Sequence, residues 1–200
     1  MKKLLLIGGG GHAISCIDVI KSIKKYKIQG IIVNDKSQNQ TPFKHLGNDN
    51  DLTKLRSNYD YAFIGIGQIK NSNIREKYFN KLKKLEYKIP KFMSKFAYIS
   101  KDTNILDGTI VMHHSIINAD CKVGYNCIIN TKSLFEHNVN VENNCHISTG
   151  VIINGGVTVG SKTFIGSGTI VHENIKIGKE CIITAGSIIK QNVKDGSIIK

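Results

Sequence analysis

One repeat constrains this chain more than any other feature of its sequence. From Ile99 to Ile189, every sixth residue is aliphatic or phenylalanine, without a slip of register. These positions are Ile99, Ile105, Val111, Ile117, Val123, Ile129, Phe135, Val141, Ile147, Ile153, Val159, Ile165, Val171, Ile177, Ile183 and Ile189. The residue two places before each of them is mostly small, from Ala97 to Ser187. One large and one small inward residue per hexapeptide fill a narrow prism, so the repeat predicts a parallel β-helix of about five coils over residues 97–193.

The cysteines fit the same register. Four of the five, Cys121, Cys127, Cys145 and Cys181, fall on the small inward positions. A buried cysteine in an apolar stack acts as a small hydrophobic side chain, so we expect these four to pack in the core and not to bind a metal. An odd number of cysteines also argues against a disulfide framework.

The start of the chain bears on its compartment. The opening MKKLLLIGGGG has an apolar core of only Leu4 to Ile7. A signal peptide needs roughly 7–15 such residues, so we interpret this run as a buried first strand and expect a cytoplasmic protein without a membrane span.

The first 92 residues follow a different pattern, in which short apolar runs alternate with amphipathic segments. The runs KLLLIG, GIIVND and YAFIGIG predict buried strands, and YKIPKF predicts a short last strand. Residues 36–50 are polar and predict a loop. We therefore expect a small parallel α/β domain over residues 1–92 and a β-helix domain over residues 93–200.

Two helices are expected between these strands. The first spans about His12 to Lys25, with an apolar face made of Ile14, Ile17, Ile20 and Ile23. The second spans about Asn73 to Leu85, with a stripe made of Ile74, Tyr78, Leu82 and Leu85.

The charge of the chain favours anionic partners. Lysine and arginine number 28 against 15 aspartate and glutamate, which gives a formal net charge of +13. Nucleotides, phosphates and coenzyme A are suitable partners for such a surface. The lysines are spread through the first half and are not clustered with aromatic residues, which argues against nucleic acid.

The glycine-rich start of the first helix points to a nucleotide. Gly8-x-Gly10-x-x-Ala13 follows a strand, and Asp35 ends the second strand, where a ribose contact belongs. About four strands make only half of the arrangement that holds a dinucleotide, so a single nucleotide fits this domain better. The alternative is that these glycines only permit the turn from strand to helix.

Candidate catalytic residues must lie on outward positions of the β-helix, because the inward ones are buried. Glu136 and His137 directly follow an inward phenylalanine, and His146 precedes an inward isoleucine. An outward histidine is more often a solvated side chain, but His137 adjoins a carboxylate that could orient its ring. The nearby segment INGG contains Gly155 and offers backbone N–H groups. A base beside such donors is what acyl transfer requires.

The segments GGGGHAISCIDVI, FIGIG and FEHNVNVENNCHISTGVIINGGVTVG resemble the sugar O/N-acyltransferase family over nearly the whole chain. This family includes UDP-4-amino-sugar N-acetyltransferases of the bacillosamine pathway and sialic-acid O-acetyltransferase relatives. The resemblance implies an α/β half-Rossmann domain that holds a nucleotide sugar, followed by a left-handed parallel β-helix. It also implies acetyl-CoA as co-substrate, no metal, and a homotrimer with coenzyme A between neighbouring prisms.

The resemblance assigns roles to individual residues. His137 would act as general base beside Glu136 and Asn138, and Asn138 stands where family members often have a carboxylate. The implied acetyl-CoA contacts are His146, Gly155 (which would also steady the oxyanion), Ser167 and Ala185. The implied nucleotide-sugar contacts are Gly10, Gly11, His12, Asn34, Asp35 and Gly67.

We therefore expect N-acetylation of the 4-amino group of a UDP-linked amino-dideoxy sugar, used in glycan biosynthesis. An O-acetyltransferase acting on a sugar such as sialic acid is one alternative. A non-catalytic nucleotide-sugar-binding scaffold is another, and it need not bind acetyl-CoA. A zinc lyase of the carbonic-anhydrase type would require two histidines five residues apart, and none of the seven histidines has that spacing.

Overall fold

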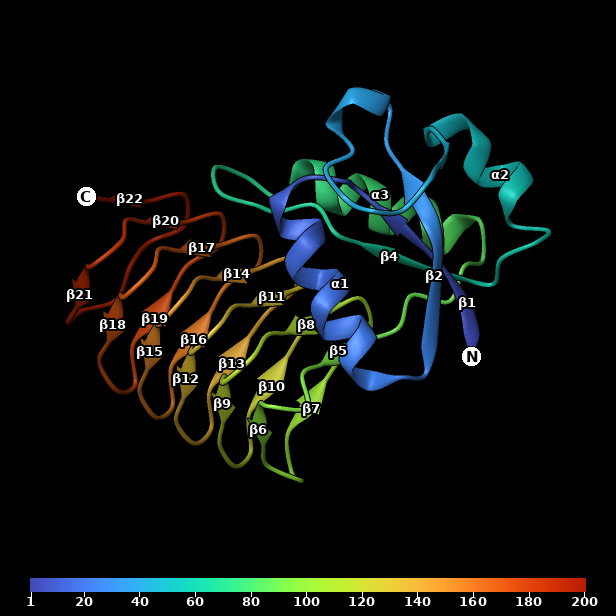
Figure 1. Ribbon diagram of the computed structural model, residues 1–200. Helices are drawn as coiled ribbons and strands as arrows, with labels where there is room; N and C mark the ends of the chain where they lie inside the picture. The colour runs from blue at the N-terminus through green and yellow to red at the C-terminus, as the bar shows by residue number, and fades with distance from the viewer.

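The computed structural model describes residues 1–200, which form an α/β domain and a long coil of short strands (Figure 1). The α/β domain lies along one side of the coil, with α1 (Gly11–Ile23) next to β5 (Phe92–Met93) and β8 (Ile110–Val111). The predicted fold class, an α/β domain followed by a hexapeptide-repeat β-helix, is confirmed.

The N-terminal domain is built on one parallel sheet with the strand order β3-β2-β1-β4. Its strands are β1 (Lys2–Ile7), β2 (Tyr26–Ile32), β3 (His45–Gly47) and β4 (Tyr61–Ile64). Leu4 and Leu6 of β1 pack toward α1, whereas Leu5 and Ile7 pack toward α3 (Asn73–Lys84) on the other face. The apolar run of β1 is therefore continuous because both faces of the strand are covered.

Short helical segments complete the N-terminal domain. They are η1 (Lys36–Gln38), η2 (Asp49–Asp51) and α2 (Leu52–Leu55). No helix of the chain combines the length and the apolar character that crossing a membrane requires.

The coil consists of two-residue strands that pair in three parallel sheets. The seven-stranded sheet has the order β22-β20-β17-β14-β11-β8-β5, the six-stranded sheet β21-β18-β15-β12-β9-β6, and the five-stranded sheet β19-β16-β13-β10-β7. After β5 and β8, named above, the strands are β6 (Tyr98–Ile99), β7 (Asn104–Ile105), β9 (Ile116–Ile117), β10 (Lys122–Val123), β11 (Ile128–Ile129), β12 (Leu134–Phe135), β13 (Asn140–Val141), β14 (His146–Ile147), β15 (Ile152–Ile153), β16 (Thr158–Val159), β17 (Phe164–Ile165), β18 (Ile170–Val171), β19 (Lys176–Ile177), β20 (Ile182–Ile183), β21 (Ile188–Ile189) and β22 (Ile198–Ile199). Ile129 pairs with Ile147, so one coil takes 18 residues.

The interior of the prism matches the predicted register. Every large inward position from Ile105 to Ile189 is buried, and Ile99 is partly buried beside the same core. The four cysteines on small inward positions are fully buried. Several corners are turned by asparagine in the left-handed backbone conformation, including Asn126 and Asn138, a conformation that asparagine tolerates better than most residues.

The outward side chains give each sheet a different character. The five-stranded sheet, called the polar sheet below, presents Asn104, Lys122, Asn140, Thr158 and Lys176. The seven-stranded sheet, called the covered sheet, presents Phe92, Ile110 and Ile128 to a core shared with α1. The six-stranded sheet, called the apolar sheet, presents Tyr98, Ile116, Leu134, Ile152, Ile170 and Ile188. Of these, Tyr98, Ile116 and Ile188 are exposed in the single chain, so the apolar sheet has an unpartnered hydrophobic face.

The helix faces differ from the sequence expectation at one position each. Ile14 is 46% exposed and Ile74 is 59% exposed, although both were expected on buried faces. The expected Ile17 and Ile20 of α1 are buried, together with Ala13, Cys16 and Val19. The direction in which a helix packs is set by its neighbours, and each helix here carries apolar residues on more than one side.

Two segments outside the helices also differ from expectation. Residues 36–50, predicted as a loop, contain β3, which pairs with β2. In YKIPKF, Lys88 makes only a single bridge to Tyr61, while Phe92 pairs with Ile110 of the β-helix. The coil also continues beyond residue 193 through β22. β3 and β5 are too short for an alternating pattern to reveal them. β22 lies outside the six-residue register, because Ile199 pairs with Ile183 only 16 residues earlier.

Candidate active site

Three loops follow the carboxyl ends of β1, β2 and β4 and meet at one edge of the N-terminal sheet. The first holds Gly10 and Gly11 at the N-terminus of α1, where Gly10 is the N-cap without a side-chain cap. A Cβ atom on either glycine would meet no atom within 4 Å, so the backbone there is open to a ligand. Free N–H groups at the start of a helix suit a phosphate group.

Asn34 and Asp35 follow β2 at the same edge of the sheet. Asn34 Oδ1 accepts a hydrogen bond from the Asp49 N–H at 3.1 Å, and Asp35 Oδ1 accepts one from the Ser37 N–H at 2.9 Å. Hydrogen bonds from the side chain and the backbone of Ser37 lower the pKa of the exposed Asp35 carboxyl. Both side chains thus shape this loop beside the glycine-rich turn.

Gly67, in the loop after β4, lies beside His12. A Cβ atom on Gly67 would be 3.5 Å from the Cβ of His12, and the ring centroids of His12 and His146 are 6.5 Å apart. The backbone oxygen of Gln68 is 2.5 Å from His146 Nδ1, and Gln68 Nε2 donates to the Asn144 oxygen at 3.0 Å. The structure therefore brings His12, Gly67 and His146 together where the two domains meet.

His146 occupies an outward position of the prism, as expected, but it is not exposed to solvent. His146 lies on β14 of the covered sheet and is only 7% exposed, because the loop after β4 covers it. Burial is the main cause that lowers the pKa of His146 to about 4 and the pKa of His12 to about 3, and the Arg75 cation adds to both effects. Both imidazoles are therefore neutral at neutral pH, and His12 Nε2 has no hydrogen-bond partner.

Arg75 links the domains and was not anticipated from the sequence. Its side chain is 1% exposed, and Nη1 donates to the oxygens of Ile64 and Ile66 at 3.1 and 2.6 Å. Nη2 donates to the backbone oxygen and to Oδ1 of Asn126 at 3.2 and 2.8 Å. Arg75 therefore holds the loop after β4 against a corner of the β-helix. The sequence did contain a sign that Arg75 is buried: it lies three residues before Tyr78, on the same side of α3 as the apolar stripe.

A second group of site residues lies elsewhere, on the turn between β12 and β13. The His137 ring is in contact with Gly155 of the next coil, since a Cβ atom on Gly155 would be 2.7 Å from His137 Nε2. His137 Nδ1 is 2.9 Å from Asn138 Oδ1. An amide oxygen can only accept, so Nδ1 donates in this contact, and in the neutral form of the ring the lone pair is then on Nε2. The Gly155 N–H has no acceptor within the chain.

Glu136 is not the partner of His137 in this structure. Its Oε2 accepts a hydrogen bond from Asn118 Nδ2 of the preceding coil at 3.2 Å. The group that orients the imidazole is the neutral amide of Asn138. The carboxylate expected to orient the ring is therefore replaced by an amide, and Glu136 stabilises the stacking of coils instead.

The predicted acetyl-CoA contacts occupy two different edges of the prism. Ser167 and Ala185 are exposed on turns that join the covered sheet to the apolar sheet, and the Ser167 hydroxyl is 2.9 Å from that of Ser148. His137 and Gly155 lie on turns that join the apolar sheet to the polar sheet. One chain therefore does not bring these residues together, because the whole apolar sheet separates them.

Known protein families and solved structures resemble this chain in both domains. The profile of the PglD N-terminal domain matches residues 3–82, and that of the hexapeptide repeat of succinyl-transferase matches residues 116–154 and 156–191. PerB from Caulobacter crescentus, in complex with CoA and GDP-perosamine, superposes with a TM-score of 0.91 at 26% identity, over 99% of this chain and 93% of that one. The chain matches the sugar acyltransferase family in both of its domains.

Two further structures resemble this acyltransferase. A His-to-Asn variant of perosamine N-acetyltransferase from Caulobacter crescentus, also with CoA and GDP-perosamine, has a TM-score of 0.91 at 25% identity, over 99% of this chain and 93% of that one. The acetyltransferase domain of PglB from Neisseria gonorrhoeae, in complex with acetyl coenzyme A, shares the fold with a TM-score of 0.92 at 23% identity, over 98% and 95% of the chains. The acyltransferase has no group of three or more His, Cys, Asp or Glu side chains that could hold a metal ion.

Proposed function

We propose that this acyltransferase transfers the acetyl group of acetyl-CoA to the amino group of a nucleotide-linked amino sugar. The structural relatives at 25–26% identity, which contain CoA together with GDP-perosamine, support an amine on a sugar nucleotide as the acceptor. The observation that carries the proposal is the His137 imidazole, which has a free Nε2 and lies beside the unpaired Gly155 N–H.

The chemistry follows from these two groups. The amine nitrogen attacks the thioester carbonyl carbon, and His137 Nε2 accepts the proton that the nitrogen loses as the C–N bond forms. The Gly155 N–H donates to the oxygen that becomes negatively charged. Asn138 keeps the proton of the neutral imidazole on Nδ1. The C–S bond then breaks, and the proton passes from His137 to the departing thiolate.

The acceptor belongs at the carboxyl end of the N-terminal sheet. The open N–H groups of Gly10 and Gly11 would receive the phosphates, and the loop of Asn34 and Asp35 would lie along the nucleoside. His12, Gly67 and His146 would then face the part of the ligand nearest the β-helix.

A homotrimer would complete the site. The N-terminal domain packs on the covered sheet, whereas His137 lies on the opposite edge of the prism, so a sugar held by one chain is remote from that chain's own base. In a cyclic trimer whose apolar sheets face the axis, the edge of one chain that carries Ser167 would lie beside the edge of the next that carries His137. The exposed apolar side chains on that sheet supply the hydrophobic contact.

A cytoplasmic location fits the cysteines. All five are free and buried, which suits a reducing compartment better than an oxidising one.

The direct test is release of thiol from acetyl-CoA in the presence of UDP- and GDP-linked 4-amino sugars, compared with their 4-hydroxy counterparts. The proposal predicts turnover with an amino sugar and formation of the amide, identified by mass spectrometry. Thiol release that is independent of the sugar nucleotide, or acetylation of a hydroxyl alone, would contradict it.

A further inference from the structure

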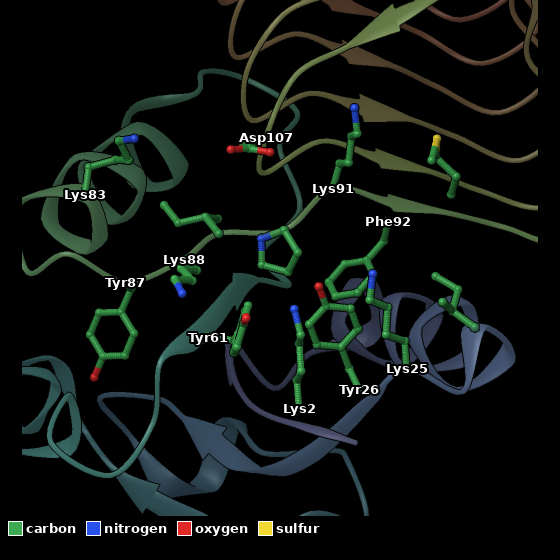
Figure 2. Close-up of a pocket in the computed structure, with 14 residues that line it drawn as sticks. Lys2, Lys25, Tyr26, Tyr61, Lys83, Tyr87, Lys88, Lys91, Phe92 and Asp107 are labelled. Carbon is green, nitrogen blue, oxygen red and sulfur yellow. The ribbon is translucent and has the colours of Figure 1, made fainter. Parts of the chain in front are cut away.

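The N-terminal domain has a hollow lined by both hydrophobic and charged side chains, at the edge of the sheet opposite to the nucleotide-sugar loops. All strands of this sheet are parallel, so Lys2, Tyr26 and Tyr61 mark the amino ends of β1, β2 and β4. The hollow between them and the segment Pro90–Met93 has a volume of about 760 Å³ (Figure 2). No residue assigned to the proposed active site lines it.

The hollow carries a strong excess of positive charge. The side chains that carry the charge are Lys2, Lys25, Lys83, Lys88, Lys91 and Asp107, that is, five lysines against one aspartate. None of the five ammonium groups takes part in an ion pair of the chain. Lysines gathered around a hollow without carboxylate partners repel one another, and a bound anion would relieve that repulsion.

Tyrosine rings organise the ammonium groups. The Nζ atoms of Lys2 and Lys88 both point at the Tyr61 ring, at 4.8 and 5.7 Å from its centroid (Figure 2). Tyr26 meets Tyr61 edge-on at 5.5 Å between centroids. Lys91 Nζ donates to the Ile105 oxygen at 2.6 Å, and this hydrogen bond attaches the Lys91 side chain to the β-helix. The Tyr61 ring therefore holds the ammonium groups of Lys2 and Lys88 close together, where both can contact one bound anion.

We propose that this hollow binds a diphosphate group, as a second anion site separate from the nucleotide-sugar loops. A single phosphate would leave much of the positive charge uncompensated, whereas two linked phosphates present oxygens on both sides to the surrounding lysines. The ligand is free pyrophosphate or the diphosphate tail of a soluble nucleotide. This assignment stands on the geometry of the hollow and does not depend on the proposed transferase activity.

The test is lysine footprinting of the full-length protein. An amine-reactive ester labels the lysines, and mass spectrometry gives the labelling rate of each with and without inorganic pyrophosphate, and with ADP. We expect Lys2 and Lys88 to be labelled about threefold or more slowly with either probe. Lys122 and Lys176, on the polar sheet, serve as internal controls and should keep their rates.

Charge-matched variants and lipid vesicles distinguish a diphosphate site from general anion attraction and from membrane binding. In a K2Q/K88Q variant, protection of Lys25 and Lys91 should be lost, whereas in a K122Q/K176Q variant of equal charge it should persist. Equal protection of all lysines, or protection only near the glycine-rich turn, at Lys36 and Lys70, would overturn the proposal. Protection by phosphatidylglycerol vesicles but not by pyrophosphate would also overturn it, because the hollow would then be a membrane-binding surface.

Discussion

The imidazole of His137 is in direct contact with Gly155, the residue 18 positions later on the next coil, where a Cβ atom would stand 2.6 Å from His137 Cε1 and 2.7 Å from Nε2. Gly155 is not among the glycines with positive φ, so alanine fits its backbone. The Gly155→Ala substitution should therefore leave the fold intact and displace the ring. We expect kcat to fall by about 10²-fold, because a misplaced base loses alignment with the amine.

A double-mutant cycle controls this prediction. In a His137→Ala background the ring is absent, so Gly155→Ala should have little further effect on turnover. Additive losses in the thiol-release assay would mean that Gly155 acts independently of the histidine.

A charged residue in the middle of the apolar sheet should prevent formation of the proposed trimer. Ile152 lies in the middle of the outward side chains of this sheet, and aspartate there should leave an uncompensated charge in the proposed trimer interface. We expect Ile152→Asp to be monomeric by light scattering and to lose turnover, with the Tm of the coil largely retained. Thr158→Asp, on the polar sheet, is the matched control and should remain trimeric. A trimeric Ile152→Asp variant with full activity would rule out this face as the interface.

Arg75 should be important for stability and for substrate binding. Replacement by methionine leaves the Ile64 and Ile66 oxygens and the Asn126 side chain without their donor, which should cost about 1–3 kcal/mol of unfolding free energy. Because the same loop holds Gly67, the KM for the sugar nucleotide should rise more than that for acetyl-CoA. Lys77→Met on the exposed side of α3 is the control for helix and charge effects. Equal unfolding free energies of the two variants would show that the buried guanidinium contributes nothing.

The two buried histidines predict a loss of stability in mild acid. Their pKa values in the folded chain, about 3 for His12 and about 4 for His146, lie below the ordinary value of 6.5. Below pH 6.5 the unfolded chain therefore binds protons that the folded chain does not. The free energy of unfolding is unaffected by these histidines above pH 6.5, and it decreases as the pH falls from 6.5 toward their pKa values in the folded chain. Between pH 7.5 and pH 5, urea unfolding should show a decrease of roughly 2 kcal/mol per histidine.

Substitution separates these histidines from other acid effects. His146→Leu removes one of the two groups, so the decrease between pH 7.5 and pH 5 should shrink to about half. His172→Gln leaves both buried histidines in place and should keep the wild-type dependence. An unchanged pH dependence in His146→Leu would contradict the assignment.

The sequence was sufficient for the β-helix, because its hexapeptide register places a large side chain on every inward position from Ile105 to Ile189. It was not sufficient for the helix faces, where Ile14 and Ile74 are exposed because packing on the sheet and the coil selects other positions. The burial of His146 and the role of Arg75 depend on contacts between the domains, which no local pattern reports.

The distribution of the site over two edges follows from the same register, because Ser167 lies 30 residues, or five hexapeptides, after His137 and three hexapeptides complete one coil. The register does not show which sheet the N-terminal domain covers, because that depends on contacts between the domains. Asn138 departs from the family pattern, yet its amide oxygen is the group that holds the His137 ring. The chemistry at a position therefore depends on geometry more than on residue type.

The most direct test of the mechanism is turnover of the His137→Ala variant, measured by thiol release with acetyl-CoA and the amino-sugar nucleotide that the wild-type protein accepts. Calorimetric titration of both substrates should accompany it. The mechanism predicts that kcat falls by about 10²- to 10⁴-fold while both dissociation constants stay close to wild type, because an exposed side chain on a rigid turn has little part in binding. Turnover close to wild type would contradict it and would remove His137 from the mechanism.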